Sequence, residues 1–259
     1  MKDRWIVSSL MSGAVALLIL GSYTKQQTVE AVTQQEEHQT YKLAAGAHVD
    51  VSNISGPVSI EPTNGPSAEV HIYRTAPNPD DLVYRKVFVE QTSSGLTIRQ
   101  KDESSEPSQI DLLNRVVLKL PRQVSVSGNN IGGAFKISGS GIDGAIDLDR
   151  ISGSVEVMNL NGALTVSGVS GNVRVAVARI NDAGVRVSNV SGSIYLRLAS
   201  DLNAELSVGN TSGGVRNQIQ GLALALVSTG PSTYSGRLGA GGPRIVVSNV
   251  TGAIVLQGI

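Results

Sequence analysis

The chain has 259 residues, with 21 basic and 21 acidic side chains, so its formal net charge is zero at neutral pH. A balanced charge argues against nucleic acid as a partner, because that affinity depends on neutralising phosphates. The absence of cysteine excludes disulfides, thiolate metal sites and cysteine nucleophiles. With 29 glycines and 3% aromatic residues, the core must consist mainly of Val, Ile, Leu and Ala.

The first segment, residues 1–24, has the pattern of an export signal. Lys2 and Arg4 precede an uncharged, largely apolar stretch that begins at Trp5, which is typical of a signal peptide or a signal anchor. Ser22 stands where lipid attachment would need a cysteine, which argues against a lipoprotein. We expect export across the cytoplasmic membrane to a periplasmic, cell-surface or membrane-anchored position, with membrane contact only through this segment.

Residues 25–40 are rich in Gln, Glu and Thr and lack apolar periodicity, so they are predicted to be a polar spacer. From 41 to 121 the sequence predicts an N-terminal β segment that caps the domain following it. Its period-two runs are typical of strands and lie at 69–74, 85–90, 96–99 and 116–120.

A seven-residue phrase then recurs: an apolar residue, a small polar residue, Gly, any residue, and a short strand of alternating apolar positions. Clear copies begin at Ile54, Ile142, Ile151, Leu160, Val169, Val190 and Val250. Between 131 and 211 successive copies, including degenerate ones, are nine to twelve residues apart. Such self-similarity indicates a repeat architecture, and we assign residues 122–259 to a β-strand-repeat solenoid.

Each phrase supplies one strand and the corner before it. The glycine is expected to adopt positive φ, and the polar residue before it to hydrogen-bond the turn. Two phrases make a coil of about twenty residues, so we favour two strands per coil over a three-faced β-helix. The predicted class is all-β, a β-solenoid or parallel β-helix-like fold. An antiparallel β-sandwich is the alternative, because short strands at this spacing are also its signature.

Equivalent outward positions recur in every second phrase. Lys136, Glu156, Arg174, Tyr195 and Arg216 follow one another at steps of 20, 18, 21 and 21. In a two-phrase coil they should form a ladder with rungs about 4.8 Å apart. Arginine offers forked hydrogen bonds to carboxylate or phosphate, so the ladder is a candidate site for an extended anionic polymer. The competing interpretation is that outward positions are polar for solubility. The opposite face would carry Asp147, Thr165, Arg186 and Ser207.

No catalytic, cofactor or metal site is predicted. The chain's histidines lack the close spacing of metal ligands: His38, His48 and His71. The Gly- and Asp-rich stretch at 139–144 resembles a calcium-binding repeat. Calcium needs six or more oxygen ligands and only one copy is present, so we interpret the stretch as a turn.

Four short motifs stand out in the sequence: Val-Ser-Asn-Val-Ser-Gly at 187–192, Val-Ser-Asn-Val-Thr-Gly at 247–252, Gly-Gly-Pro-Arg-Ile-Val at 241–246 and Gly-Leu-Thr-Ile-Arg at 95–99. They resemble the bacterial candidate-adhesin family called domain of unknown function 4097. The resemblance covers roughly 41 to 259 and implies an exported or membrane-attached β-strand-repeat domain of a bacterium. It brings no catalytic residues.

Together these features favour a non-catalytic protein with a structural or adhesive role at the bacterial cell envelope, whose partner is an anionic envelope polymer or another protein. Open solenoid ends are unpaired edges, so either the N-terminal β segment folds over the ends or the protein self-associates through them. One alternative is a polysaccharide-active β-helix enzyme, although Asp147 and Glu156, the acids available for it, would lie on opposite faces. The other is an envelope-stress or signalling accessory that binds a protein partner.

Overall fold

The computed structural model describes residues 32–101, 110–139, 141–219, 224–229 and 233–259. The leader predicted at residues 1–24 lies outside these ranges. Within them no helix is long and apolar enough to cross a membrane. The helical content of the described residues is one short 3-10 helix, η1 (Pro79–Val83).

The strands form two long mixed sheets, which confirms the all-β class. Sheet A has, in spatial order, β1 (Thr33–Lys42), β4 (Ser67–Ala76), β7 (Leu113–Pro121), β3 (Val58–Thr63), β9 (Phe135–Ile137), β11 (Val155–Leu160), β13 (Val173–Val177), β15 (Ile194–Leu198), β21 (Ile254–Gly258) and β17 (Val215–Gln218). Sheet B has β18 (Leu224–Thr229), β19 (Tyr234–Leu238), β16 (Ala204–Thr211), β20 (Arg244–Val250), β14 (Val185–Val190), β12 (Leu164–Val169), β10 (Ile146–Ile151), β8 (Ser125–Ile131), β2 (His48–Ser52), β6 (Gly95–Gln100) and β5 (Val87–Gln91).

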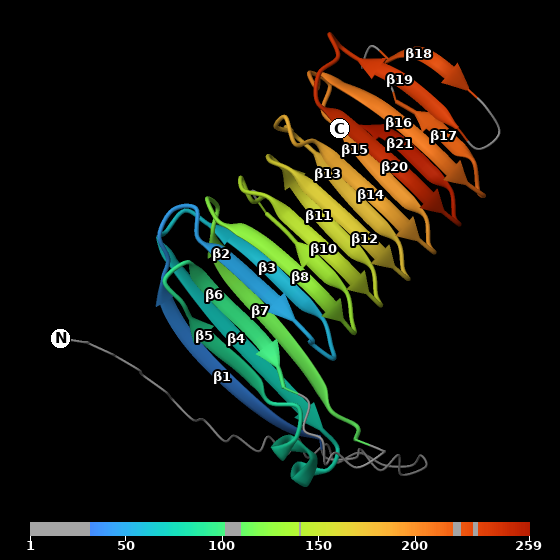
Figure 1. Ribbon diagram of the computed structural model, residues 1–259. Coiled ribbons are helices and arrows are strands. Elements are labelled where there is room, and N and C mark those ends of the chain that lie inside the picture. The colour runs from blue at the N-terminus through green and yellow to red at the C-terminus, as the bar shows by residue number, and fades with distance from the viewer. Residues whose placement is uncertain (1–31, 102–109, 140, 220–223, 230–232) are drawn as a thin grey trace, which may run out of the picture.

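The repeat winds as a solenoid with two strands per coil, as Figure 1 shows. Successive phrases alternate between the sheets, so that Val155 pairs with Val173 and Val173 with Ile194 in parallel register. Antiparallel pairs occur at the two ends of the stack, as β1–β4–β7 and β5–β6 at one end and β16–β19–β18 at the other. The alternative of an antiparallel sandwich is therefore wrong for the repeat.

Inward side chains stack in apolar columns between the two sheets. Because side chains alternate along a strand, every second residue of each phrase points inward. Val157, Val175 and Leu196 succeed one another in this way and are each at most 1% exposed. The apolar cluster runs from Leu43 to Leu256. Each coil is thus stabilised by its neighbours rather than alone.

The corner glycines do not have the positive φ that the sequence analysis predicted. The φ angles of Gly153, Gly171 and Gly192 lie outside the left-handed region. Their role is to permit close approach between coils. A Cβ on Gly171 would lie 2.6 Å from the carbonyl oxygen of Gly153, and a Cβ on Gly192 would lie 2.4 Å from that of Gly171. The corners stack so closely that no side chain fits between them.

The left-handed conformation falls three residues earlier, mostly on asparagine. Residues with φ between 55° and 57° at this corner are Asn53, Asn130, Asn189, Asn210 and Asn249. Asparagine tolerates this region better than most residues with a side chain. The amides also link coils: Asn249 donates to Asn189 Oδ1 at 3.1 Å and accepts from Asn210 at 3.2 Å. We call this set the asparagine corner.

The last coil of the chain is not the last in space. Strand β20 lies between β14 and β16, and β21 lies between β15 and β17. In Figure 1 the red strands β20 and β21 accordingly sit among the orange ones. Strands β16 to β19 thus form the terminal layers, although they precede β20 in the sequence. This order explains the long gap in the repeat between the copies at 211 and 250.

Residues 41–121 continue both sheets: in sheet B β2 pairs with β8 and β6 with β2, and in sheet A β3 pairs with β9 and β7 with β3. Beyond them lie the antiparallel strands β1, β4 and β5. Residues 33–40, which the sequence analysis assigned to the polar spacer, belong to β1 and pair with β4 along their whole length. Backbone hydrogen bonds hold such an edge strand without apolar periodicity, so composition alone did not reveal it.

Candidate functional site

One outward row crosses the whole of sheet A, with one residue from each strand paired in register. It consists of His38, His71, Val117, Ser59, Lys136, Glu156, Arg174, Tyr195, Val255 and Arg216. We call it the sheet A row. The first four residues of the predicted ladder are direct neighbours in it. Val255 separates Arg216 from Tyr195, because β21 is inserted between β15 and β17.

Neighbouring side chains of the row contact one another in pairs. Lys136 Nζ lies 3.2 Å from Glu156 Oε2, so these two charges offset each other. The guanidinium of Arg174 lies over the ring of Tyr195, with Cζ 5.1 Å from the ring centroid. This is the geometry of a cation–π contact, which orients the cation without neutralising it.

Beside Arg174 and Tyr195 the outer face of sheet A is hollowed, with a volume of about 730 Å³. Part of its lining comes from a second outward row, in which Ala176, Arg197, Gln257 and Gln218 are register partners. Ala176 is buried, with 3% exposed. Its small side chain leaves the space that Arg174 and Arg197 border.

The hollow presents two cations to solvent. Neither Arg174 nor Arg197 forms an ion pair within the described ranges of the chain. They stand on the adjacent strands β13 and β15 and on the same face. Paired guanidinium groups in this position suit forked hydrogen bonds to carboxylate or phosphate. The sequence analysis missed Arg197 because it considered one outward residue per strand; its place two residues after Tyr195 was the available signal.

On sheet B, Asp147, Thr165 and Arg186 are register partners, while Val246 of β20 separates Arg186 from Ser207. Asp147 lies on β10 of sheet B, whereas Glu156 lies on β11 of sheet A. The two acids therefore stand on opposite faces and form no catalytic pair.

A His, an Asp and two Ser residues meet on sheet B, but not in the order of a catalytic triad. Ser127 Oγ donates to Asp50 Oδ1 at 2.6 Å, and His48 Nε2 lies 3.0 Å from the same hydroxyl. His48 Nδ1 lies 3.0 Å from Ser125 Oγ. In a triad the imidazole stands between hydroxyl and carboxylate. Here the serine stands between them, and among the described residues no carboxylate orients the imidazole.

The Gly- and Asp-rich turn at 139–144 uses its acid for a protein contact. Asp143 Oδ1 lies 2.9 Å from the Arg122 guanidinium and accepts from Asn161 Nδ2 at 3.2 Å. The Asp143 carboxylate is therefore bound by a guanidinium and an amide of the protein itself, which fits the interpretation of this stretch as a turn. Ser140 of this turn lies outside the described ranges.

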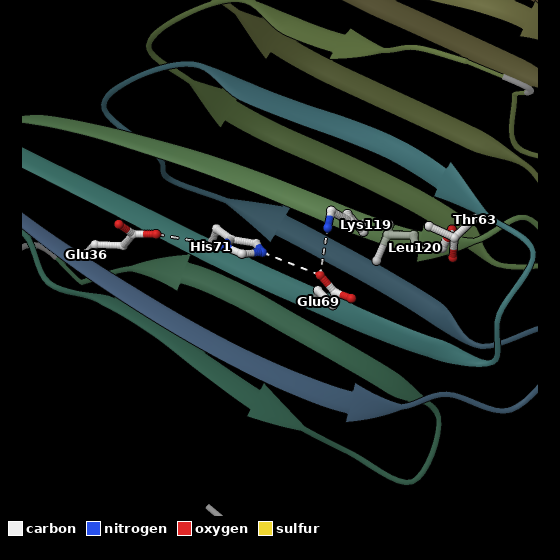
Figure 2. A network of polar contacts seen from close by, with 6 residues as sticks. All are labelled: Glu36, Thr63, Glu69, His71, Lys119 and Leu120. Atoms are coloured by element: carbon white, nitrogen blue, oxygen red, sulfur yellow. Dashed lines mark hydrogen bonds and ion pairs between the residues drawn. The ribbon is translucent and has the colours of Figure 1, made fainter. Parts of the chain in front are cut away.

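At the N-terminal end of the sheet A row, pairing of β1 with β4 brings two histidines together. His38 and His71 are register partners with stacked rings, whose centroids are 4.1 Å apart. Figure 2 shows His71 between Glu36 and Glu69, with Nδ1 3.9 Å from Glu36 Oε1 and Nε2 3.5 Å from Glu69 Oε2. Lys119, which lies 48 residues after His71 in the sequence, completes the network.

Lys119 Nζ donates to Glu69 Oε2 at 2.9 Å. This hydrogen bond lowers the pKa of Glu69, although partial desolvation acts in the opposite direction. The same bond raises the pKa of Lys119. Linear spacing gave no sign of the network, because its members come from three strands.

A family model described as Toastrack DUF4097 matches residues 2–255. Among solved structures, a candidate cell adhesion protein from Clostridium sporogenes is 11% identical, with a TM-score of 0.52 over 88% of this chain and 100% of that chain. A candidate adhesin from Bacteroides fragilis is 14% identical, with a TM-score of 0.43 over 86% of this chain and 97% of that one. No curated protein matches the chain. The structural likeness concerns the fold, whereas the family match spans nearly the whole sequence, and the chain belongs to the Toastrack DUF4097 family.

Proposed function

We propose that this chain is a non-enzymatic solenoid of the bacterial cell envelope, with an adhesive or structural role, and that it binds an extended anionic polymer at the hollow beside Arg174 and Arg197. The proposed export, to a periplasmic, cell-surface or membrane-anchored position, rests on the leader pattern of residues 1–24. An adhesive role agrees with the name of the Clostridium sporogenes protein.

The observation that carries the proposal is the two guanidinium groups at the hollow, neither of which forms an ion pair with a residue that the structure describes. A third cation, Arg216, lies three strands from Arg174 along the sheet A row. At strand spacing this is about 14 Å. An extended polymer lying along the row would reach all three arginines, whereas a small anion would contact only those at the hollow. This arrangement favours a polymeric ligand.

The test is sedimentation of the full chain with isolated bacterial envelopes over a salt series. We expect binding that weakens with salt, because exposed charges are screened. The double variant Arg174→Ser/Arg197→Ser should weaken binding by more than about tenfold, since each charged hydrogen bond contributes about 1.5–3 kcal/mol. Arg216→Ser should have a smaller effect, seen with the polymer and not with a small anion.

The matched control is Arg186→Ser/Arg244→Ser, which removes two exposed arginines from sheet B. This variant lowers the net charge by the same amount as Arg174→Ser/Arg197→Ser. Because its two arginines lie on the other sheet, it should leave envelope binding unchanged. Equal losses in both double variants would point to unspecific charge attraction, and full binding by Arg174→Ser/Arg197→Ser would end the proposal. Binding that persists at high salt, after removal of polysaccharide, would favour a protein partner instead.

The enzymatic alternative has less support. The acids that it requires, Asp147 and Glu156, stand on opposite sheets. Paired carboxylates in glycoside hydrolysis must face one another across the scissile bond, about 5–10 Å apart. The cluster of Ser127, His48 and Asp50 also lacks the order needed to activate a nucleophile.

A further inference from the structure

We propose that His38, His71 and Glu69 form a binding site for a divalent transition-metal ion such as Zn²⁺. The site goes beyond the proposed polymer binding, because four strands of sheet A separate β4 from β13, which carries Arg174. Two imidazoles and a carboxylate are a donor set that holds zinc in proteins, with a remaining position open.

The three ligand atoms already lie close together, within 4.8 Å of one another. His38 faces His71 across the β1–β4 pair, and Glu69 precedes His71 by two residues, which places it on the same face. Zinc requires distances of about 2.0–2.2 Å to nitrogen and oxygen. Rotation of the exposed His38 side chain can bring the donors to these distances without any change in strand register.

His71 carries unused binding capacity. Its side chain is 19% exposed. Both ring nitrogens are shielded from solvent, and neither forms a hydrogen bond with any residue in the described ranges. The contacts with Glu36 at 3.9 Å and Glu69 at 3.5 Å are longer than hydrogen bonds. Buried polar atoms nearly always have a partner. A metal ion bound at one ring nitrogen would supply that partner, and Glu36 could then orient the ring through the other nitrogen.

The donor chemistry distinguishes between cations. Imidazole favours Zn²⁺, Cu²⁺ and Ni²⁺, whereas Ca²⁺ and Mg²⁺ prefer oxygen ligands throughout. Lys119 opposes the metal, because its ammonium bonds Glu69 Oε2 and adds a positive charge next to the site. Replacing Lys119 should therefore strengthen metal binding, an effect opposite to that expected if the network were only an ion-pair cluster.

The experiment uses the full chain without a polyhistidine tag. Zn²⁺ is titrated by calorimetry, and Co²⁺ is followed by its visible absorption, which reports tetrahedral coordination. We expect one ion per chain, with a rise in melting temperature on addition of Zn²⁺. Both His38→Asn and His71→Asn should lower the affinity by about 100-fold or more, and Lys119→Gln should raise it by about tenfold.

The third histidine supplies the matched control. His48 is exposed on sheet B, and its two nitrogens contact Ser125 and Ser127, so His48→Asn should bind Zn²⁺ as the wild type does. His38 is exposed at an edge strand, and circular dichroism is expected to show that His38→Asn keeps the fold. Wild-type binding by His38→Asn or His71→Asn, an equal loss in His48→Asn, or Ca²⁺ binding as tight as Zn²⁺ binding would overturn the proposal. Arg174→Ser/Arg197→Ser should retain the metal, which separates this site from the hollow.

Discussion

A residue in the left-handed region lets each coil turn from sheet B into sheet A. Five of these positions hold asparagine, one holds Gly168 with φ 67°, and one holds Arg150 with φ 54°. The Cβ of an ordinary residue is crowded in this conformation, whereas glycine and asparagine adopt it more readily. At Arg150 a hydrogen bond offsets part of this backbone strain, because the guanidinium donates to Asn129 Oδ1 at 2.6 Å.

Replacing Arg150 with asparagine should therefore stabilise the protein. We expect Arg150→Asn to raise the free energy of unfolding by about 0.5–1 kcal/mol, since asparagine meets less strain at positive φ. Arg150→Val should have the opposite effect, because a β-branched side chain is least compatible with this conformation. The measurement is urea unfolding of both variants beside the wild type, and a more stable valine variant would contradict the argument.

At each corner that leads from sheet B into sheet A, the backbones of successive coils are in direct contact. The stacked glycines run Gly133, Gly153, Gly171 and Gly192, and each would place a Cβ within 2.6 Å of an atom in the coil below. A methyl group there must push two coils apart, which disturbs the apolar columns on both sides of the corner. The cost is therefore shared by neighbouring coils.

Gly171→Ala should lower the free energy of unfolding by about 1–3 kcal/mol, the range for overpacking a rigid site. The matched control is Gly209→Ala in β16, where φ is not positive and no heavy atom lies within 4 Å of the added Cβ. At such a position alanine should raise the free energy of unfolding by about 0.4–1 kcal/mol, because it lowers the conformational entropy of the unfolded chain. Thermal melts of the two variants should thus shift in opposite directions. Shifts of the same sign would exclude steric stacking as the role of the corner glycine.

Periodicity in the sequence predicts those elements that repeat locally. The spacing of Glu156, Arg174 and Tyr195 was enough to place them in one row, because each coil adds one strand to sheet A in register with the strand before it. The conformation of the corner glycines was predicted wrongly, because a need for small size and a need for positive φ both select glycine. The pairing of His38 with His71 and the placing of β21 beside β15 depend on contacts between distant segments, and no local pattern encodes them.

The molecule as a whole is a stack whose order departs from the order of the chain at both ends. At the N-terminal end β2 and β3 stack on β8 and β9, and β4 to β7 lie beyond them. The C-terminal end has the same kind of departure. Strands β20 and β21 stack on β14 and β15 with the register of an ordinary coil. Strands β16 to β19 lie beyond them, and β17 pairs, among the described strands, only with β21. Residues between β15 and β20 therefore behave as an insertion that folds back over the end of the solenoid.

Deleting residues 202–239 tests this interpretation, because it joins β15 to β20 through 199–201 and 240–243. That connection has seven residues, as many as the natural link between β13 and β14 at 178–184. We expect the shortened protein to fold as a solenoid in sequence order, with strand-rich circular dichroism and a cooperative melt. Its terminal strands would then be β20 and β21, whose unpaired edges should promote association that depends on concentration in sedimentation.

Removing residues 243–259 provides the contrast, although it takes away fewer residues. This deletion removes β20 and β21. Strand β20 pairs with β14 on one side and with β16 on the other, so without it β14 and β16 both lose a hydrogen-bonded neighbour. Because a solenoid coil is stable only against its neighbours, we expect the layers from β16 onward to lose ordered structure. If the smaller deletion were tolerated and the larger one were not, residues 202–239 would be an integral part of the stack rather than an insertion at its end.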